Sequence, residues 1–308
     1  MEAILGQLLI VVALVALGSG GRALKIFSPE YSILLNNIAT YFAIPALVFL
    51  NIQSSHEQAI TPALLKVPII AYLTILISGM VAFVSGRILK LPRKQMGVYL
   101  LTSMFGSTAF VGLPILTAVT GNKTQVQHSF YSELGSLVML VTIGIVIASF
   151  YGEGSKFGWQ NLLAIPRSGP FVAMVLALLF YDDTIPKPIT DILRIISGST
   201  LFIMMFSLGI TIVWKDIRRH LVPVLAINFI KLILAPLIGL ALARLLGVGP
   251  RETYVIVIDS ATPSVIFCLG YAAQYKLDAE FASEAVFSSF FFCLLTIPFV
   301  SLFVPPFS

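Results

Sequence analysis

Two short segments of the sequence combine small hydroxyl residues with helix-breaking residues, a composition that suits the binding of a carboxylate. The first runs from Phe105 to Pro114 and the second from Asp259 to Ser264. Proline lacks a backbone donor and glycine loosens a helix, so both segments are candidates for local unwinding. The N-terminal end of an interrupted helix carries partial positive charge and attracts an anion. The candidate substrate-binding residues are Ser107, Thr108, Gly112, Pro114, Thr262, Pro263 and Ser264.

Two charged residues near these segments lie within strongly apolar stretches of the sequence. Asp259 begins the second segment, and Lys231 lies inside the apolar stretch 221–246. A charge in the hydrocarbon of a membrane is costly unless it is paired or hydrated, so such residues are functional candidates. We interpret Lys231 as a further substrate-binding candidate that attracts negative charge. Asp259 is a candidate for carrying a coupling proton, with a static ion pair to Lys231 as the alternative.

Five other titratable residues lie near the ends of apolar stretches. Glu133 and Glu284 each follow a serine near the start of such a stretch, and we take Glu133 as a second ion-coupling candidate. The alternative for both is a carboxylate at the level of the lipid headgroups. His56, His128 and His220 form no metal-binding or catalytic pattern, so we interpret them as interfacial.

The elements that position these residues are expected to be transmembrane helices. With 58% hydrophobic residues, 11% charged residues and a mean hydropathy of +0.98, the 308-residue chain has too little polar surface to cover a water-soluble globule. Only helices or a closed barrel satisfy all backbone groups in lipid. Apolar runs such as 8–17 and 221–246 lack the period-two alternation of barrel strands, which favours helices. The net charge of +5 comes from basic residues between apolar runs, which gives no reason to expect nucleic acid as a partner.

Hydropathy and the positions of proline, glycine and charge predict ten membrane spans. Their expected ranges are 3–20, 31–52, 64–88, 95–120, 129–151, 166–181, 190–213, 221–246, 252–275 and 281–303. Twelve basic residues follow the odd-numbered spans, six lie on the opposite side, and Lys231 completes the 19. By the positive-inside rule the side with twelve is cytoplasmic, which places both termini outside the membrane. We expect the membrane to be the inner membrane of a prokaryote.

An internal similarity suggests that the chain is an inverted repeat. The junction after span 3 reads GRILKLPR at 86–93, and the junction after span 8 reads ARLLGVGPR at 243–251. Five spans separate them, so a true repeat must be inverted; we divide the chain into five-helix repeats at 1–151 and 166–303. The two break segments then occupy equivalent spans, 4 and 9, near mid-membrane, where such repeats place a binding site. The alternative is an ordinary kink in each helix.

Motifs in spans 2, 4 and 9 resemble those of the auxin efflux carrier family, which includes plant auxin exporters and bacterial malate or malonate permeases. The resemblance covers nearly the whole chain. The matching residues are Pro45, Ala46, Leu47 and Phe49 in span 2, Phe110, Gly112, Leu113 and Pro114 in span 4, and Pro263, Ala272 and Tyr275 in span 9.

The resemblance implies an all-α integral membrane protein of ten helices, in which the broken helices 4 and 9 cross near the midplane at their prolines. It also implies an elevator-type mechanism, in which helices 3–5 and 8–10 move against a scaffold of helices 1, 2, 6 and 7. Three positions depart from the family pattern. Ser107 and Ala109 replace an asparagine and a glycine, so the family's amide contact is missing and Ser107 or Thr108 is expected to replace it. Asp259 stands where a neutral residue is usual.

We therefore expect a secondary transporter of a small organic anion, a mono- or dicarboxylate or an auxin-like acid. Its expected partners are membrane lipid and a coupling proton or sodium ion. We expect no cofactor and no metal site, and the chain could form a homodimer. The main alternative is a sodium-coupled symporter of the bile-acid type, for which Asp259, Ser107, Thr108 and Thr262 offer few ligands. An intramembrane enzyme is disfavoured by the absence of G-x-S-x-G and H-E-x-x-H motifs and of a second aspartate beside Asp259.

Overall fold

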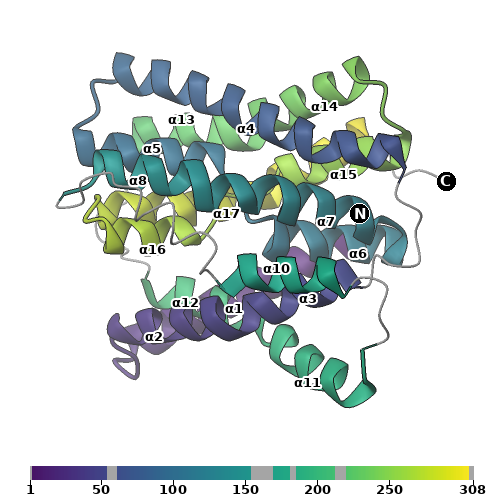
Figure 1. Cartoon of the computed structure of the whole chain (residues 1–308). Coiled ribbons are helices and arrows are strands. Elements are labelled where there is room, and N and C mark those ends of the chain that lie inside the picture. Colours follow the sequence, from purple (N-terminus) through teal and green to yellow (C-terminus); the bar gives the residue numbers. More distant parts are fainter. Residues whose placement is uncertain (1, 54–60, 154–168, 181–184, 212–219, 305–308) are drawn as a thin grey trace. The chain divides into compact units, whose positions relative to one another are not determined.

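The described part of the chain is built from helices (Figure 1). The computed structural model describes residues 2–53, 61–153, 169–180, 185–211 and 220–304. In these ranges the only β-type pairing is an isolated bridge between Gly106 and Ser264. Among the described residues, six helical stretches are long and apolar enough to cross a membrane: Glu30–Gln53, Pro62–Ile88, Gln125–Tyr151, Lys187–Thr211, Leu221–Leu245 and Ala279–Phe303. The prediction of an all-helical membrane protein is confirmed; the count of ten spans and the inverted repeat stay predictions.

The chain divides into two compact units, each assembled from separate parts of the sequence. Unit 1 comprises Met1–Gln7, Thr61–Gly158 and Ile212–Ser308, and unit 2 comprises Leu8–Ile60 and Trp159–Thr211. Each unit therefore contains segments from both halves of the chain.

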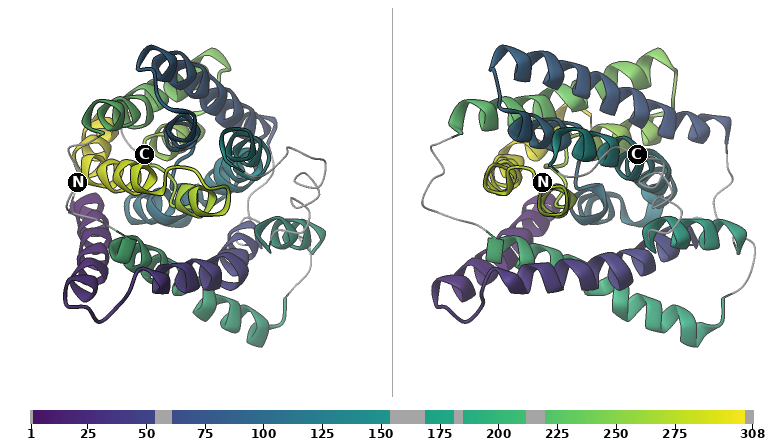
Figure 2. Two further views of the ribbon diagram at one scale, coloured as in Figure 1. Left: turned by 90° about the vertical axis from the view of Figure 1, so that its left-hand side faces the viewer. Right: turned by 60° about the vertical axis from the view of Figure 1, so that its left-hand side comes forward.

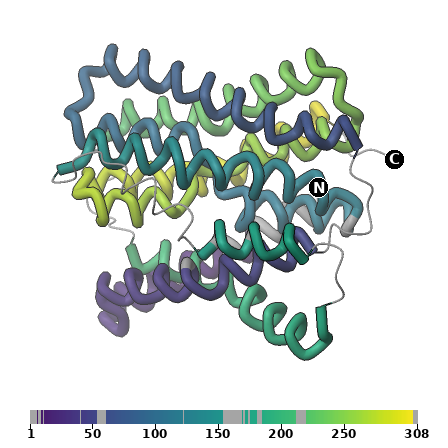
Figure 3. The backbone as a smooth tube through the Cα atoms, viewed as in Figure 1, coloured from purple at the N-terminus to yellow at the C-terminus, as the bar shows by residue number. Residues whose placement is uncertain are grey.

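Unit 2 is a small group of helices held together by close backbone contacts. Its helices are α1 (Glu2–Ala23, which begins in unit 1), α2 (Glu30–Ile38), the π-helical turn η1 (Ala39–Ala43), α3 (Ile44–Gln53), α10 (Gly169–Leu179), α11 (Lys187–Gly198) and α12 (Thr200–Thr211). Helices α2, η1 and α3 follow one another as a continuous rod (Figure 3), and α3 packs against α10 and α11. A Cβ atom added at Gly18 would lie 2.2 Å from the Phe206 carbonyl oxygen, so α1 and α12 touch through their backbones.

Unit 1 contains both predicted break segments and is the larger of the two units. Its elements are α4 (Pro62–Ile88), α5 (Arg93–Met104), η2 (Thr108–Gly112), α6 (Leu113–Thr120), η3 (Gly121–Thr124), α7 (Gln125–Ser129), η4 (Phe130–Leu137), η5 (Leu140–Gly144), α8 (Ile145–Tyr151), α13 (Leu221–Phe229), η7 (Ile230–Leu234), α14 (Ala235–Leu245), α15 (Pro250–Ser260), α16 (Phe267–Gln274) and α17 (Ala279–Phe303). Helix α4 packs against α5, η4 and α14, and α17 packs against α13 and α16 (Figures 1 and 2).

Local sequence signals set the ends of the longest helices in unit 1. Thr61 is the N-cap of α4, where its hydroxyl accepts a hydrogen bond from the Leu64 N–H at 3.3 Å and Pro62 occupies the first turn. The chain leaves α4 through Lys90, whose φ of 53° lies in the left-handed region. Asp278 caps α17 in the same way, accepting from the Phe281 N–H at 3.0 Å. These caps fix where α4 and α17 begin.

Candidate functional site

The two predicted break segments are interrupted helices that hydrogen-bond to each other. Helix α5 ends at Met104 and η2 begins at Thr108, while α15 ends at Ser260 and α16 begins at Phe267. Between these ends the Ser107 N–H donates to the Pro263 carbonyl at 2.7 Å, and the Val265 N–H donates to the Phe105 carbonyl at 3.0 Å. We call residues 105–107 and 262–265 together the paired break.

The paired break requires a glycine at its centre, and most of its polar groups find partners within it or on neighbouring helices. A Cβ atom on Gly106 would lie 2.4 Å from the Thr262 hydroxyl oxygen, so no larger residue fits without moving that side chain. Pro263 has no N–H to satisfy. Ser264 donates from its hydroxyl to the Thr102 carbonyl at 2.8 Å, and its N–H donates to the Ser289 hydroxyl at 2.9 Å. This pairing meets the demand of a membrane interior that buried backbone groups find partners.

The predicted substrate-binding residues lie at different places relative to the paired break. Ser107, Thr262, Pro263 and Ser264 belong to it, and all four are buried. The Thr262 hydroxyl donates to the Asp259 carbonyl at 2.6 Å. The Ser107 hydroxyl is buried and has no hydrogen-bond partner among the described residues. Ser107 is therefore the one hydroxyl of the paired break left free for a ligand.

Thr108, Gly112 and Pro114 follow the paired break instead of forming it. The Thr108 and Ser132 hydroxyls are hydrogen-bonded at 2.8 Å. Gly112 lies against Asp259, because a Cβ there would come within 2.2 Å of a carboxylate oxygen. Pro114 occupies the first turn of α6, where its missing N–H costs nothing. The expected meeting of the two segments at both prolines therefore holds for Pro263 but not for Pro114.

Asp259 forms a fully buried pair with His128, in which the imidazole lies within hydrogen-bond distance of the carboxylate. The His128 Nδ1 atom lies 3.1 Å and 2.9 Å from the two carboxylate oxygens of Asp259, and neither side chain has any exposed surface. The interpretation of His128 as interfacial was wrong, and so was the alternative that paired Asp259 with Lys231. The predicted span began at residue 129, one residue after His128. The helical stretch begins at Gln125, so His128 lies inside it. His56 lies outside the described residues.

Lys231 places an ammonium group beside the paired break. It lies in η7, is 3% exposed, and donates from Nζ to the Ser260 carbonyl at 2.7 Å. Ser260 is the last residue of α15, so Lys231 satisfies a carbonyl that has no partner within the helix and lies at the negative end of the helix dipole. A Cβ on Gly106 would lie 2.9 Å from the same Nζ atom. A cation therefore lies directly against the break.

Glu133 and Tyr131 connect η4 to this site. Glu133 is 1% exposed, and its charge acts on His128. The Tyr131 hydroxyl lies 2.8 Å from the Ser260 hydroxyl, which in turn donates to the Ile256 carbonyl. Glu133 is therefore buried in the protein, and its role in ion coupling stays a prediction.

A second buried histidine joins the starts of three helices in unit 1. The His220 Nδ1 atom lies 2.9 Å from a Glu284 carboxylate oxygen, and Gln95 lies 3.1 Å from the other ring nitrogen. Gln95 also donates to Asp278 at 2.9 Å. His220 and Glu284 are 7% and 9% exposed, so both side chains are buried in the protein, and their interfacial and headgroup-level interpretations stay predictions. This cluster holds α5, α13 and α17 together.

Within the ranges given above, no group of three or more His, Cys, Asp or Glu side chains is arranged to hold a metal ion. What the site brings together is an ammonium, a free hydroxyl and a buried acid–imidazole pair.

Comparisons with known proteins agree on one kind of activity. The profile of the family described as "Membrane transport protein" matches residues 3–160 and 154–301 of the chain. The chain is 26% identical over 296 residues to an uncharacterised transporter of Methanocaldococcus jannaschii, covering 94% of this chain and 95% of that protein. It is also 26% identical over 295 residues to an uncharacterised transporter of Methanothermobacter thermautotrophicus, covering 95% of each.

Removing either member of the buried Asp259–His128 pair should lower the free energy of unfolding. Each single variant should lose more than half of the stability that the double variant loses. Asp259→Ala or His128→Ala leaves a polar partner buried alone, which is expected to lower the free energy of unfolding by about 3–5 kcal/mol. The double variant should fall short of the sum of the single variants by about 1–3 kcal/mol. Chemical unfolding of the purified protein in detergent measures all four species.

The matched cycle combines Asp259→Ala with Lys231→Ala and is expected to give a smaller coupling energy. A coupling to Lys231 that exceeds the coupling to His128 would contradict the pairing described here.

Proposed function

Because the chain belongs to the membrane transport protein family, the auxin efflux carrier family of the sequence motifs, we propose that it is a secondary transporter that binds a small organic anion at the paired break. The chain is an integral membrane protein, and both relatives are named as transporters, which gives no support to an intramembrane enzyme. The observation that carries the proposal is the buried ammonium of Lys231 beside an interrupted pair of helices.

The charge of Lys231 is available to a ligand. Asp259 is engaged by His128, and within the described ranges the Lys231 ammonium makes a single hydrogen bond, to an uncharged carbonyl. An ammonium has three donors, so two remain for a carboxylate. Its position is fixed by the bond to Ser260 and by the bulk of the surrounding protein. A buried cation without a charged partner is costly, and an incoming anion offsets that cost.

Ser107 supplies the second contact in this proposal. Its hydroxyl is buried and has no hydrogen-bond partner in the described part of the chain, and its N–H already holds the paired break together. Ser107 stands where the family carries an asparagine, so it offers one hydroxyl donor in place of an amide. The proposed anion therefore carries a carboxylate, held by the Lys231 ammonium and the Ser107 hydroxyl. Mono- and dicarboxylates and auxin-like acids all meet this requirement.

The division into two units supports an elevator-type movement. Every residue of the paired break, together with Lys231 and Asp259, belongs to unit 1. Unit 2 holds nearly all of the predicted spans 1, 2, 6 and 7, the expected scaffold. In the proposed mechanism unit 1 carries the bound anion across the membrane as one body. The site then needs no rearrangement of its own hydrogen bonds during transport.

The Asp259–His128 pair is the proposed site of proton coupling. The charged groups that face it are Lys231 from η7 and Glu133 from η4, and all four side chains are buried. An acid–imidazole pair can hold one proton or two, so its net charge changes by one unit when it takes up a proton. Such a change beside Lys231 alters the attraction of the site for an anion.

The sodium-coupled alternative is less well supported. A sodium ion at an interrupted helix is coordinated by carbonyl and carboxylate oxygens. Here the carbonyl at the end of α15 is already occupied by the Lys231 ammonium, and the nearby carboxylate of Asp259 is occupied by His128.

A panel of small carboxylates should stabilise the purified protein. Acetate, malonate, malate and indole-3-acetate are the probes, and at least one is expected to raise the melting temperature, because a ligand at 100 times its Kd stabilises the folded form by about 2.7 kcal/mol. Lys231→Met removes the ammonium and keeps the aliphatic chain. It is expected to weaken binding at least tenfold, about 1.4 kcal/mol.

The matched control is Lys66→Met, because Lys66 also donates to a carbonyl at the end of a helix, that of Leu246 at 2.8 Å. It should bind carboxylates like the wild type. Unchanged binding in Lys231→Met would remove Lys231 from the site.

Flux of radiolabelled malonate into proteoliposomes is expected to respond to a proton gradient and not to a sodium gradient. Asp259→Asn keeps the size of the side chain and removes its ionisation, so it should abolish the response to the proton gradient. Sodium-dependent flux, or a full proton response in Asp259→Asn, would contradict the proposed coupling.

A further inference from the structure

A basic pocket opens at one end of unit 1, where α4 ends, α5 begins and α8 ends. The cavity has a volume of about 890 Å³, and its walls carry the cations Arg87, Lys90 and Arg93. Phe83, Phe150 and Tyr151 supply aromatic walls between these charges. No carboxylate lines the cavity in the part of the chain that the structure describes. The pocket therefore presents concentrated positive charge to whatever enters it.

Glu153, which follows α8, does not neutralise these cations. Glu153 lies 3.0 Å from the Nζ atom of Lys94, and this neighbouring ammonium holds the pKa of the Glu153 carboxyl below its ordinary value. Glu153 is thus already engaged. Among described residues, neither Arg87 nor Lys90 has a carboxylate within ion-pair distance.

Arg93 is held in place by the wall of the pocket. Its guanidinium donates to the Phe150 carbonyl and lies 5.6 Å from the centre of the Phe150 ring. A guanidinium fixed in this way recognises phosphate with little loss of side-chain freedom. Arg87 and Tyr151 line the same cavity as Arg93.

The first turn of α5 carries positive charge, which an anion bound in the pocket would offset. Arg93 and Lys94 are its first two residues, and no acidic residue occupies the first turn. Cations at this end oppose the helix dipole, which destabilises the helix. An anion in the pocket would compensate both the dipole and the three side chains. The left-handed turn at Lys90 holds this loop between α4 and α5.

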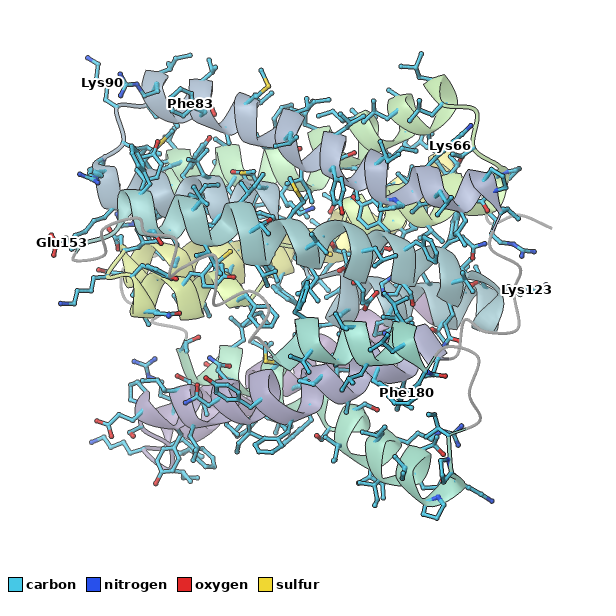
Figure 4. The ribbon with its side chains drawn as sticks, in the orientation of Figure 1. Lys66, Phe83, Lys90, Lys123, Glu153 and Phe180 are labelled. Carbon is cyan, nitrogen blue, oxygen red and sulfur yellow. The ribbon has the colours of Figure 1, made fainter. Side chains whose placement is uncertain are left out.

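The surface that leads into the pocket is apolar. Helix α4 lies in a stretch that can cross a membrane, and its last turns expose Met80, Phe83 and Val84 with 69%, 46% and 57% of their surfaces free. Figure 4 shows Phe83 and Lys90 at the same end of unit 1, with Lys66 and Lys123 at the other end. The cations of the pocket therefore lie where a span ends, at the level of lipid headgroups, and hydrocarbon-contacting residues adjoin them.

We propose that this pocket binds the phosphate of an anionic phospholipid, with the lipid's acyl chains lying along the exposed apolar face of α4. A soluble phosphate would bind the cations, but it has no apolar group to contact the exposed face of α4. A zwitterionic lipid has acyl chains that can contact this face, but its headgroup carries a positive charge that the cations of the pocket repel. Each cation near a membrane surface contributes to the attraction for anionic headgroups, and here three of them share one cavity. This site is separate from the paired break, and its test does not depend on transport.

Thermal unfolding of the full chain in a neutral detergent tests the proposal with three probes. They are dioctanoyl phosphatidylglycerol, dioctanoyl phosphatidylcholine and inorganic phosphate. Phosphatidylglycerol is expected to raise the melting temperature in a saturable way, while phosphatidylcholine and phosphate at the same concentrations leave it almost unchanged. Equal shifts with phosphatidylcholine would overturn the proposal, and a shift with phosphate that matches phosphatidylglycerol would overturn the choice of a lipid.

Variants locate the effect in the pocket. Arg87→Gln with Lys90→Gln is expected to weaken binding of phosphatidylglycerol roughly ten- to thirtyfold. The matched control, Lys123→Gln with Arg244→Gln, removes two exposed cations outside the pocket and should bind as the wild type does. The charge-conserving pair Arg87→Lys with Lys90→Arg should retain binding, so it still tests the pocket if the neutral variant fails to fold. Wild-type affinity in the neutral pocket variant, or equal losses in pocket and control variants, would refute the assignment.

Discussion

The structure of unit 1 depends on the requirement that two interrupted helices satisfy each other's backbone groups. In lipid an unpaired N–H or carbonyl costs several kcal/mol, so a helix can break only where another group supplies partners. The Ser107 N–H and the Pro263 carbonyl, and the Val265 N–H and the Phe105 carbonyl, provide those partners reciprocally. Gly106 permits the approach, and Pro263 removes one donor that would otherwise need a partner. Neither segment could be interrupted in this way without the other.

The charges around the paired break follow from the same constraint. The end of α15 leaves carbonyls without partners inside the helix, and the Lys231 ammonium satisfies that of Ser260. Asp259, one residue earlier, lies on the same short helix and is hydrogen-bonded by His128 from α7. Asp259 and Lys231 are therefore held by different partners, and no carboxylate of the described residues lies within ion-pair distance of the Lys231 ammonium. The proposed binding of an anion depends on this separation, because a static ion pair would already use the charge of Lys231.

The positions of the breaks could be predicted from the sequence, but the partners of the charged residues could not. Gly106 and Pro263 signal interruption through their own backbone chemistry, which is local. The partner of Asp259 is 131 residues away, and nothing in the local sequence links the two. His128 was misplaced because the start of its span was set at 129, whereas the helical stretch begins at Gln125. Pro114 was assigned to the meeting point by resemblance, yet it fits the first turn of α6. The cations of the basic pocket indicate topology in the sequence, but no local pattern predicts that three of them line one cavity.

Gly106 offers the most direct test of the claim that the paired break forms the anion site. A methyl group at this position would collide with the Thr262 hydroxyl at 2.4 Å and come within 2.9 Å of the Lys231 Nζ atom. Gly270 in α16 has open space around it and provides the matched control. Carboxylate-induced stabilisation should therefore be lost in folded Gly106→Ala protein and kept in Gly270→Ala. Carboxylate binding by Gly106→Ala with the affinity of the wild type would show that the anion binds elsewhere.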